Sequence, residues 1–594
     1  MTSTRGRDAL LGAAAGLVGG LAFGWALQAN DMMADSLGLI GLTTLGGGTV
    51  VHFLISALVG AGFGVIFGQP GESFAATISS GVLYGLLWWV LGPLTLAPLL
   101  MGHWPTWALS EAGTAFFNVV GHALYGGVLG LSFHALSAAY ARWRPPDAGE
   151  RRASAPPARH VVILGGGFAG VSAAQRLAQL TARDQSIEVT LVSQSNYLLF
   201  TPMLAEVASS ALQAQHISAP IRAASPRTRF LRAAVEAIDT ESQTVRVYAG
   251  HNLPSETLAY DHVVLALGSI PDYRGLPGLE EHAFTLKTLE DAMRLRNHVI
   301  SLLERADVEP DPAERQRQLT FVVAGGGFAG TETVAELFDL AHDVLRYYPR
   351  IDPAELRFML VHSRDRILPE LSHALGVYSQ GKLEDRGIRC VLNARVAEAT
   401  AEAVVLQDGR TIDTRTLVWT AGNQPNPLLA TLPHELNRRG AIVTDETMRV
   451  VGVDDVWAVG DCAQIPDPHH EGEFYPPTAQ HALRQGKVVA ENVVAALKGR
   501  APKPFRFRTL GLLVALGHRT GAAEIQGRRF SGLLAWLLWR SIYLSKLPGL
   551  EKKVRVMLDW TIDLFFPRDI VLTVDTSVLA RSGQEAADTG ADPY

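Results

Sequence analysis

Two segments of the chain carry the same glycine-rich signature, and each one ends a hydrophobic run. The first reads HVVILGGGFAG at residues 160–170, and the second reads LTFVVAGGGFAG at residues 319–330. Helix-forming sequence follows both, so each signature predicts a buried strand, a tight turn and a helix. The turn needs glycine for its sharp bend, for close backbone approach to a pyrophosphate and for helix packing. The six glycines with these roles are Gly165, Gly167, Gly170, Gly325, Gly327 and Gly330.

Two such turns imply two dinucleotides, each with its pyrophosphate at the N-terminus of a helix. The pair predicts a flavoprotein reductase that holds FAD in one site and a nicotinamide dinucleotide in the other. Strands and helices alternate beyond residue 160, which is typical of a doubly wound parallel sheet. Residues 452–463, GVDDVWAVGDCA, are expected to return the chain to its first domain. The predicted fold is therefore α/β, with two Rossmann-like dinucleotide-binding domains, the second inserted in the first.

The N-terminal part is apolar in four stretches that are free or nearly free of charge: residues 9–26, 37–67, 75–101 and 112–139. Each is long enough to cross a hydrocarbon core, which needs about 20 residues. Arg5 and Arg7 precede the first stretch and Arg142 and Arg144 follow the fourth, whereas the intervening loops hold no Lys or Arg. The positive-inside rule then puts both ends in the cytoplasm. We expect an all-α transmembrane domain of four helices in the cell inner (cytoplasmic) membrane, with the catalytic part on the cytoplasmic side.

A second interpretation of the first stretch is a signal peptide, because arginines precede an apolar run that ends in small residues. Its removal would leave three spans that still finish inside. His52, His122 and His134 lie in or near the spans, and intramembrane ionisable groups are functional candidates. His122 and His134 are twelve residues apart, about 120° around a helix, which does not favour a stacked pair of haems. We expect these histidines to pack or to form interhelical hydrogen bonds.

Composition excludes several classes of protein. Only two cysteines occur, Cys390 and Cys462, so there is neither a disulfide framework nor a CxxC pair for dithiol chemistry. The formal net charge is -6, and no basic block is interleaved with aromatic residues, so no nucleic-acid partner is expected. No metal site is expected either.

Near the C-terminus, residues 531–547 are apolar but short and are interrupted by Arg540. This pattern favours a helix that lies in the membrane interface. The side chains expected to face lipid are Trp536, Trp539, Tyr543, Met557, Trp560, Phe565 and Phe566, with Lys552, Lys553 and Arg555 for headgroups. The alternative is a pair of helices in the core or at the interface of a homodimer.

From about residue 160 to 570 the chain resembles the type II NADH:quinone oxidoreductases, a family of non-pumping, FAD-containing, membrane-attached dehydrogenases. The resemblance rests on separated motifs in family order: VSQSNYLLFTPMLAEVASS at 192–210, ALGS at 266–269, GGGFAGTETVAEL at 325–337, TAGNQPNPLL at 420–429, VGDCAQ at 459–464 and AQHALRQG at 479–486. It implies that hydride passes from NADH to FAD and that two electrons then reach a membrane quinone.

The resemblance also implies roles for single residues. Glu332 would hydrogen-bond the nicotinamide or relay a proton, with helix capping in the first turn as the alternative. Gln480 and Gln485 would orient the quinone, and Asp461 would accept a hydrogen bond from the ribityl chain of FAD. Further contacts with the cofactors are implied for Ser193, Thr201, Gly268, His362, Gly422, Gly460 and Ala479.

The sequence departs from the family pattern at three places. The acidic residue that often binds the adenosine ribose is replaced by Ser193 in the first site and by His362 in the second. Arg364 and Arg366 follow His362, so NADPH remains an alternative to NADH, which the resemblance favours. The second glutamine of the family motif falls on Arg484, with Gln485 one place later.

The expected organisation along the chain is a transmembrane domain at 1–144, a linker at 145–157, an FAD-binding domain at 158–288 and 441–502, an NAD(P)H-binding domain at 289–440, a C-terminal membrane- and quinone-associated region at 503–576 and a disordered tail at 577–594. The expected partners are NAD(P)H, a membrane quinone and membrane lipid, and a homodimer is compatible with the sequence. Two other functions stay open. One is a flavin reductase that serves another protein or membrane acceptor, and the other is a nucleotide-sensing flavodomain fused to a transporter.

Overall fold

The computed structural model describes residues 4–29, 45–67, 74–100, 102, 104, 116–143, 159–182, 184, 186–250, 254–470 and 472–572. The chain divides into two compact units, an N-terminal unit at Met1–Ser154 and a C-terminal unit at Ala155–Tyr594. The expected linker at 145–157 and tail at 577–594 lie outside the described residues. So do the acidic loop residues between the apolar stretches.

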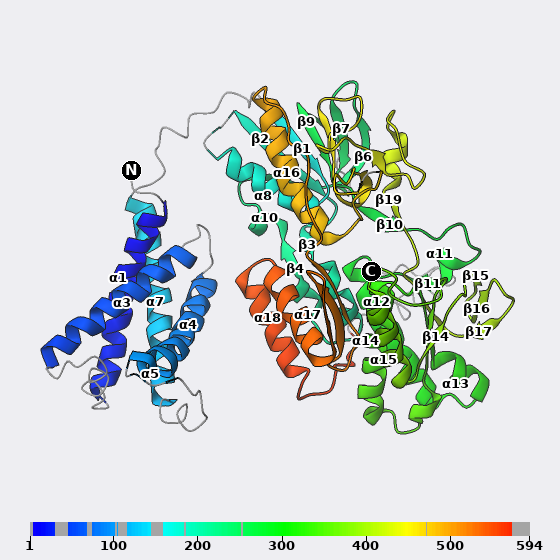
Figure 1. Ribbon diagram of the computed structural model, residues 1–594, viewed down its shortest axis with the longest axis horizontal. Helices are drawn as coiled ribbons and strands as arrows, with labels where there is room; N and C mark the ends of the chain where they lie inside the picture. Colours follow the sequence, from blue (N-terminus) through cyan, green and yellow to red (C-terminus); the bar gives the residue numbers. More distant parts are fainter. Residues whose placement is uncertain are drawn as a thin grey trace, which may run out of the picture. The chain divides into compact units, whose positions relative to one another are not determined.

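The N-terminal unit is built from four long helices, coloured blue to cyan in Figure 1: α1 (Thr4–Ala29), α3 (Leu45–Phe67), α4 (Phe74–Leu91) and α7 (Phe116–Trp143). Among the described residues, four segments are long and apolar enough to cross a membrane: Gly6–Trp25, Thr49–Phe67, Thr77–Leu96 and Val119–Tyr140. The third stretch is not one regular helix, because α4 passes into a π-helical turn, η1 (Gly92–Leu96), before the short α5 (Ala97–Leu100). Pro93 lacks the N–H that a regular helix needs there.

The four helices form two hairpins with the same glycine register. In the first, a Cβ on Gly60 of α3 would lie 2.3 Å from the Gly12 carbonyl oxygen of α1. In the second, a Cβ on Gly126 of α7 would lie 2.1 Å from the Gly81 carbonyl oxygen of α4. A second glycine lies four residues on in each helix: Gly16, Gly64, Gly85 and Gly130. Only glycine permits such a close crossing of backbones, as in the small-xxx-small contacts of membrane helices.

The histidines of this unit pack between helices, as expected. His52 Nε2 lies 2.8 Å from the Gly20 carbonyl oxygen of α1. His122 meets the Phe23 ring edge-on, with centroids 4.8 Å apart, and His134 meets Phe74 at 5.5 Å. No group of three His, Cys, Asp or Glu side chains within the described residues is placed to hold a metal ion.

The first parallel sheet of the C-terminal unit has the strand order β21-β9-β1-β2-β5. Its strands are β1 (Arg159–Leu164), β2 (Ile187–Ser193), β5 (Arg229–Arg232), β9 (His262–Leu265) and β21 (Val456–Ala458). Helices α8 (Phe168–Leu180) and α16 (Ala479–Leu497) lie side by side on it (Figure 1). A Cβ on Gly486 of α16 would come within 2.3 Å of the Ala169 carbonyl oxygen, so glycine is required for this approach.

The second parallel sheet has the order β11-β18-β12-β13-β14. Its strands are β11 (Ala283–Phe284), β12 (Thr320–Ala324), β13 (Arg357–Val361), β14 (Ile388–Val391) and β18 (Thr416–Trp419). Its helices are α12 (Leu289–Val308), α13 (Pro312–Gln318), α14 (Phe328–Val344) and α15 (His373–Asp385). All five strands fall between β9 and β21 in the sequence.

The chain therefore leaves the first sheet after β9 and returns to it with β21, where Val456 pairs with Val263. This return lies within residues 452–463, as expected. Between β9 and β21, β11 is the first strand of the chain to pair within the second sheet, with β18. Each parallel sheet is accompanied by three antiparallel strands: β6 (Ala234–Asp239), β7 (Thr244–Tyr248) and β8 (Glu256–Ala259) for the first, and β15 (Val396–Ala399), β16 (Ala403–Leu406) and β17 (Thr411–Asp413) for the second.

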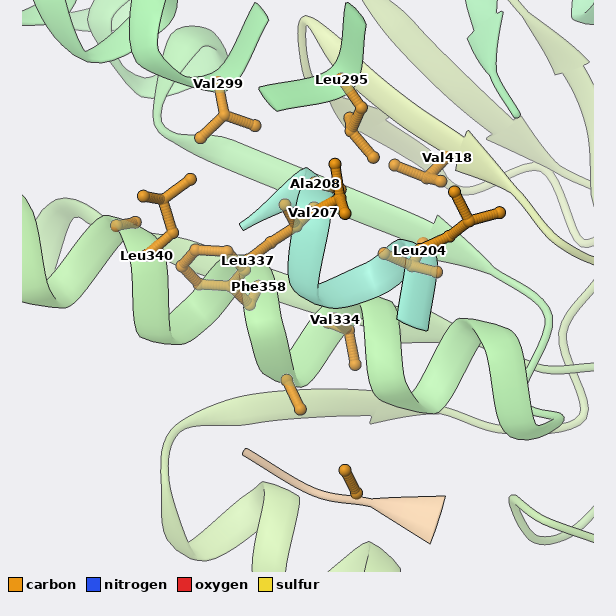
Figure 2. Packing of buried hydrophobic residues seen from close by; sticks show 14 of the residues in the cluster. Leu204, Val207, Ala208, Leu295, Val299, Val334, Leu337, Leu340, Phe358 and Val418 are labelled. Carbon is orange, nitrogen blue, oxygen red and sulfur yellow. The ribbon is translucent and has the colours of Figure 1, made fainter. Parts of the chain in front are cut away.

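A short helix from the first part of the C-terminal unit lies in the core beside the second sheet. Figure 2 shows side chains of α9 (Leu204–Ala208) packed between α12 and α14: Leu204, Val207 and Ala208 against Leu295, Val299, Val334 and Leu337. The residues of α9 belong to the family motif VSQSNYLLFTPMLAEVASS at 192–210, which the resemblance implies to cover the flavin. This segment is therefore fixed by the helices of the second sheet.

The C-terminal elements are β23 (Gly511–Ala515), β24 (Gly521–Ile525), β25 (Arg528–Ser531), α17 (Gly532–Lys546) and α18 (Leu550–Ile562). Two of the aromatic residues expected to face lipid are instead buried: Trp539 is 2% exposed and Trp560 is 5% exposed. Others of that set are open, with Phe565 at 78% and Phe566 at 65%. The prediction was wrong for the two tryptophans because helical spacing shows that residues share a face without showing what covers it.

Candidate functional site

The two glycine-rich turns have nearly the same backbone geometry. Gly165 has a φ of 118° and Gly325 a φ of 120°, in the region that favours glycine. A Cβ on Gly170 would lie 1.8 Å from the Gly165 carbonyl oxygen, and a Cβ on Gly330 would lie 1.8 Å from that of Gly325. No side chain fits at these positions. The sequence repeat is thus a repeat of structure.

The middle glycine of each turn starts a helix and leaves its end open. Gly167 is the N-cap of α8 and Gly327 the N-cap of α14, and neither receives a side-chain capping hydrogen bond. A Cβ on Gly167 would meet nothing within 4 Å, and one on Gly327 would meet only Glu370 Oε1, at 3.7 Å. Uncapped N–H groups at the positive end of a helix, with space in front of them, suit a pyrophosphate. Both turns fit a dinucleotide by this test.

The residues that replace the usual acidic residue lie against the turns. Ser193 ends β2, and its Oγ would be 2.5 Å from a Cβ on Gly166. His362 directly follows β13, and its Nδ1 accepts a hydrogen bond from the Gly326 N–H at 3.0 Å. Each therefore occupies the place where the adenosine ribose is expected in this fold.

Two glycines expected near the cofactors mark the crossings between the sheets. Gly268 has a φ of 68° and precedes β10 (Ser269–Pro271), whereas Gly422 precedes β19 (Asn423–Pro425). β10 and β19 pair antiparallel, so the two crossings run side by side. Thr201, another expected contact, is exposed at the start of the single turn η3 (Thr201–Met203), just before α9.

A chain of polar groups joins three segments at the first sheet. Lys287 Nζ donates to Ser269 Oγ at 2.9 Å, and Ser269 Oγ donates to Asp461 Oδ2 at 2.7 Å. Burial lowers the pKa of the Lys287 ammonium, and the charge of Asp461 opposes this shift. Sequence reasoning identified Asp461 but missed Lys287 and Ser269. The signal for Lys287 was its place just before Thr288, the N-cap of α12.

The glutamines of α16 point to different places. Gln485 is 3% exposed, and its Oε1 accepts a hydrogen bond from the Gly460 N–H at 2.9 Å. It thus holds the turn that carries Asp461. The Gln480 side-chain amide contacts the start of β23, where its Nε2 lies 3.5 Å from the Gly511 carbonyl oxygen. Ala479 is the first residue of α16 and directly precedes Gln480.

Arg484 occupies the place of the family's second glutamine. Its Nη1 donates to the Gln480 carbonyl oxygen at 2.7 Å, and its guanidinium lies 4.1 Å from the centre of the Phe507 ring. Burial lowers the pKa of this guanidinium. The cation is therefore held between α16 and the segment before β23 and does not face open solvent freely.

Glu332 is buried, with 9% of its surface exposed. Its Oε1 accepts hydrogen bonds from the Ala515 N–H and from Trp539 Nε1, both at 3.0 Å. It is the fifth residue of α14 and caps nothing, so the capping interpretation in the first turn is wrong. Burial raises the pKa of this carboxyl to about 8, against the effect of its two hydrogen bonds.

A second buried carboxyl was missed by sequence reasoning. Glu206 of α9 is 4% exposed and accepts a hydrogen bond from Trp560 Nε1 at 3.0 Å. Burial raises its pKa, and the charge of Arg540, 4.0 Å away, opposes the shift. The Arg540 guanidinium lies 4.0 Å from the Trp536 ring and 4.6 Å from the Trp560 ring. Arg540 interrupts an apolar helix because it turns inward to this carboxyl.

Two protein families match the C-terminal unit. The model for pyridine nucleotide-disulphide oxidoreductases covers residues 159–486. The model for the NDH2 C-terminal domain covers residues 510–569. The first match spans both glycine-rich turns and ends within α16, and the second spans β23 to α18.

The matches to two curated relatives extend over most of each relative's length. A probable NADH dehydrogenase of Dictyostelium discoideum is 32% identical over 69% of this chain and 90% of the relative. The type II NADH:quinone oxidoreductase Ndh of Mycobacterium tuberculosis is 30% identical over 72% of this chain and 94% of the relative. Among solved structures, NDH2 from Plasmodium falciparum in complex with NADH has a TM-score of 0.65 at 18% identity, over 70% of this chain and 100% of that one.

Proposed function

We propose, on the premise that this chain belongs to the type II NADH:quinone oxidoreductases within the pyridine nucleotide-disulphide oxidoreductases, that it works as a membrane-bound, non-proton-pumping dehydrogenase. The enzyme uses NADH, FAD and a quinone. We further propose a binding site for each of these molecules and a mode of attachment to the membrane. The first glycine-rich turn takes FAD and the second takes the nicotinamide dinucleotide. The second sheet and its helices then form a nucleotide-binding domain that is inserted in the domain of the first sheet.

FAD, when bound, supplies a carrier that accepts a hydride and passes on two electrons. The protein positions the reactants around it. The uncapped starts of α8 and α14 hold the two pyrophosphates, and Ser193 and His362 lie at the riboses. Lys287 and Ser269 orient the Asp461 carboxylate toward the ribityl chain, and Gln485 keeps the turn of Asp461 in place.

The proton of the reaction is held by Glu332. Its carboxyl is fixed by the Ala515 N–H and by Trp539, so its geometry does not depend on solvent. A pKa of about 8 keeps it protonated at neutral pH, ready to donate a hydrogen bond or a proton. Gln480, at the edge of β23, is the residue proposed to contact the quinone carbonyl, and Ala479 lines the same place.

The quinone reaches this edge from the bilayer along the C-terminal helices. Large apolar side chains of α17, α18 and the turn that follows are exposed together: Leu533, Leu534, Leu537, Met557, Leu558, Ile562, Phe565 and Phe566. Lys552, Lys553 and Arg555 of α18 are the cations proposed to meet anionic headgroups. Lys552 and Lys553 also donate to the carbonyl oxygens of Gln215 and Ser545, and Arg555 pairs with Glu551. Exposed apolar side chains on helices that also carry cations fit an interfacial membrane contact.

The N-terminal unit adds a multi-pass anchor in the cytoplasmic membrane. Four segments have the length and apolarity to span it, and an even number of spans returns the chain to its starting side. Arg5 and Arg7 before the first span and Arg142 and Arg144 after the fourth place both ends, and hence the catalytic unit, in the cytoplasm.

The observation that carries the proposal is the pair of turns with matching geometry and open helix ends. The test follows flavin absorbance of the detergent-purified protein without oxygen, first with NADH and then with a short-chain quinone. We expect bleaching by NADH and recovery with quinone. Bleaching without recovery would mean another electron acceptor, and no bleaching would reject the enzyme.

Glycine variants locate the two sites in the same assay. Gly167→Ala and Gly327→Ala add a methyl group where the protein leaves space, so the fold tolerates both. The methyl group still projects toward the proposed pyrophosphates, so G167A is expected to lose bound FAD. G327A is expected to keep FAD but to raise the KM for NADH about tenfold. Gly381→Ala of α15, also with free space around it, is the matched control and leaves both properties unchanged.

A further inference from the structure

The second glycine-rich turn has no carboxylate where NADH-specific sites often hold one. A carboxylate at the end of the second strand accepts the hydroxyls of the adenosine ribose and repels a 2′-phosphate. His362 stands at this position, directly after β13. We propose that the site admits the 2′-phosphate, so that NADPH is a hydride donor alongside NADH, with His362 and Arg364 as the residues that determine this specificity. The inference rests on the proposed placement of the nicotinamide dinucleotide at this turn.

The hydrogen bond from Gly326 fixes the protonation pattern of His362. Nδ1 is the acceptor in that contact, so the proton of the neutral ring is on Nε2. The ring lies flat against the turn, because a Cβ on Gly326 would be 2.7 Å from its Cγ. His362 therefore offers an N–H donor at a position where a carboxylate would offer only acceptors. A donor suits the oxygen of a ribose hydroxyl and equally that of a phosphate.

The second observation is that one nitrogen of the His362 ring makes no hydrogen bond within the described residues. Nε2 is buried and has no hydrogen-bond partner in the described structure. A buried donor without a partner is costly, so a ligand that brings an acceptor next to it is favoured. The three residues that follow His362, Ser363 to Asp365, are exposed, so the ring lies next to the protein surface along the chain.

The cations near His362 are not equivalent. Arg366 donates to the carbonyl oxygens of Leu368, Pro369 and Leu371, so it braces its own loop. The Arg364 side chain is exposed, and in the described part of the chain no carboxylate or carbonyl oxygen holds it. Its charge is close enough to act on His362, as is the opposing charge of Asp365. Arg364 is thus the cation available to a 2′-phosphate.

The acidic neighbours do not close the site. Asp365 is exposed beside Arg364, and Glu370 lies next to Gly327, on the pyrophosphate side of the turn. Neither stands at the end of β13, where a carboxylate would meet the 2′-oxygen directly. At that point the chain offers the N–H of a neutral imidazole and the positive charge of the exposed Arg364 guanidinium.

The test compares both nucleotides in the full-length, FAD-loaded protein. Flavin bleaching gives kcat/KM for NADH and NADPH, and calorimetry gives Kd for ADP-ribose and for 2′-phospho-ADP-ribose. We expect the two nucleotides to differ by no more than about tenfold in kcat/KM in the unchanged protein. His362→Asp lowers the value for NADPH about a hundredfold and changes that for NADH by about threefold at most. Arg364→Gln weakens 2′-phospho-ADP-ribose about tenfold and leaves ADP-ribose unchanged.

Arg389→Gln is the matched control, since Arg389 is an exposed arginine near the start of β14, the neighbouring strand. It should alter neither ligand. Bleaching by NADH without any by NADPH would overturn the inference and leave the proposed function intact. No bleaching by either nucleotide would instead defeat the proposed function. Tight binding of 2′-phospho-ADP-ribose that neither H362D nor R364Q weakens would place the 2′-phosphate elsewhere and reject the role of both residues.

Discussion

Two buried carboxyls are each held by an indole N–H from the C-terminal helices. Trp539 donates to Glu332 of α14, and Trp560 donates to Glu206 of α9. A buried acid without partners would be costly, so each tryptophan stabilises one. These contacts couple the helices proposed to touch the membrane directly to the residues around the reactants. The proposed quinone entry is therefore tied to the proposed nicotinamide site.

Replacement of Glu332 by Gln tests whether its proton matters. Gln keeps an acceptor for Ala515 and Trp539 and removes titration, so FAD content should persist. The folded-state pKa of about 8 lies above the ordinary value of 4.5. The stabilisation linked to this proton is therefore complete below about pH 4.5 and is lost as the pH rises through about 8. We predict that, between pH 6 and 9, Tm falls less steeply in E332Q than in the unchanged protein.

Turnover provides a second readout for the same variant. If Glu332 holds the proton used in the reaction, kcat at pH 7 falls by about a hundredfold in E332Q, and the inflection near pH 8 disappears. Glu206 also titrates with a raised pKa but is present in both proteins, so the comparison isolates Glu332. Equal kcat and identical pH profiles would leave Glu332 with a purely structural role.

The extent to which the sequence predicted this site follows from the range of the interactions. Gly165 and Gly325 were predictable because a sharp turn depends on residues next to each other. The partners of Glu332 were not, because Ala515 and Trp539 lie far along the chain and arrive only through tertiary packing. Lys287 was missed for the same reason, since its hydrogen bond to Ser269 forms only when the segment between β11 and α12 packs against β10.

At the level of elements, hydrophobic periodicity predicted the positions of helices well, but it predicted less well what packs against each face. The four apolar stretches became helices, although Pro93 broke the third, and the C-terminal segment became α17 and α18. Which face of α17 meets protein was not predictable, because the Glu206 that attracts Arg540 lies in α9. A hydrophobic stripe indicates that one face of a helix is buried, but it does not distinguish protein from lipid as the cover.

The exposed face of the C-terminal helices yields the second prediction. Phe565→Glu with Phe566→Glu replaces two strongly exposed aromatic side chains, 78% and 65% exposed, by charged ones, so the fold should be retained. We predict that turnover with a long-chain quinone in proteoliposomes falls several-fold, because insertion into the acyl boundary becomes unfavourable. Turnover with a water-soluble short-chain quinone should stay the same. Both rates are measured as NADH oxidation.

Val308→Glu serves as the control for that variant. Val308 is also apolar and 65% exposed, but it ends α12 of the second sheet, away from the proposed membrane face. V308E should leave both quinones unaffected. An equal loss with long and short quinones in F565E/F566E would show that these side chains act on the reaction and not on the membrane contact.

At the scale of the whole molecule, the two compact units have separate cores. The core of the N-terminal unit includes Phe63, Tyr84, Tyr125 and Phe133, whereas every residue of the other core clusters lies beyond residue 160. Both glycine-rich turns, Glu332 and the C-terminal helices belong to the C-terminal unit. The proposed catalytic residues and one proposed membrane contact thus all belong to the C-terminal unit.

This independence leads to the last prediction. A variant that lacks residues 1–157 should bind FAD and oxidise NADH with a short-chain quinone at a rate within about twofold of the full chain, because independent units keep their stability when separated. It should still bind vesicles that contain anionic lipid, through α17 and α18, and salt should weaken that binding by screening Lys552, Lys553 and Arg555. Flotation of vesicles measures attachment. Loss of FAD on deletion would show that the N-terminal unit supports the catalytic fold, and an active variant that no longer floats with vesicles would assign attachment to the spans alone.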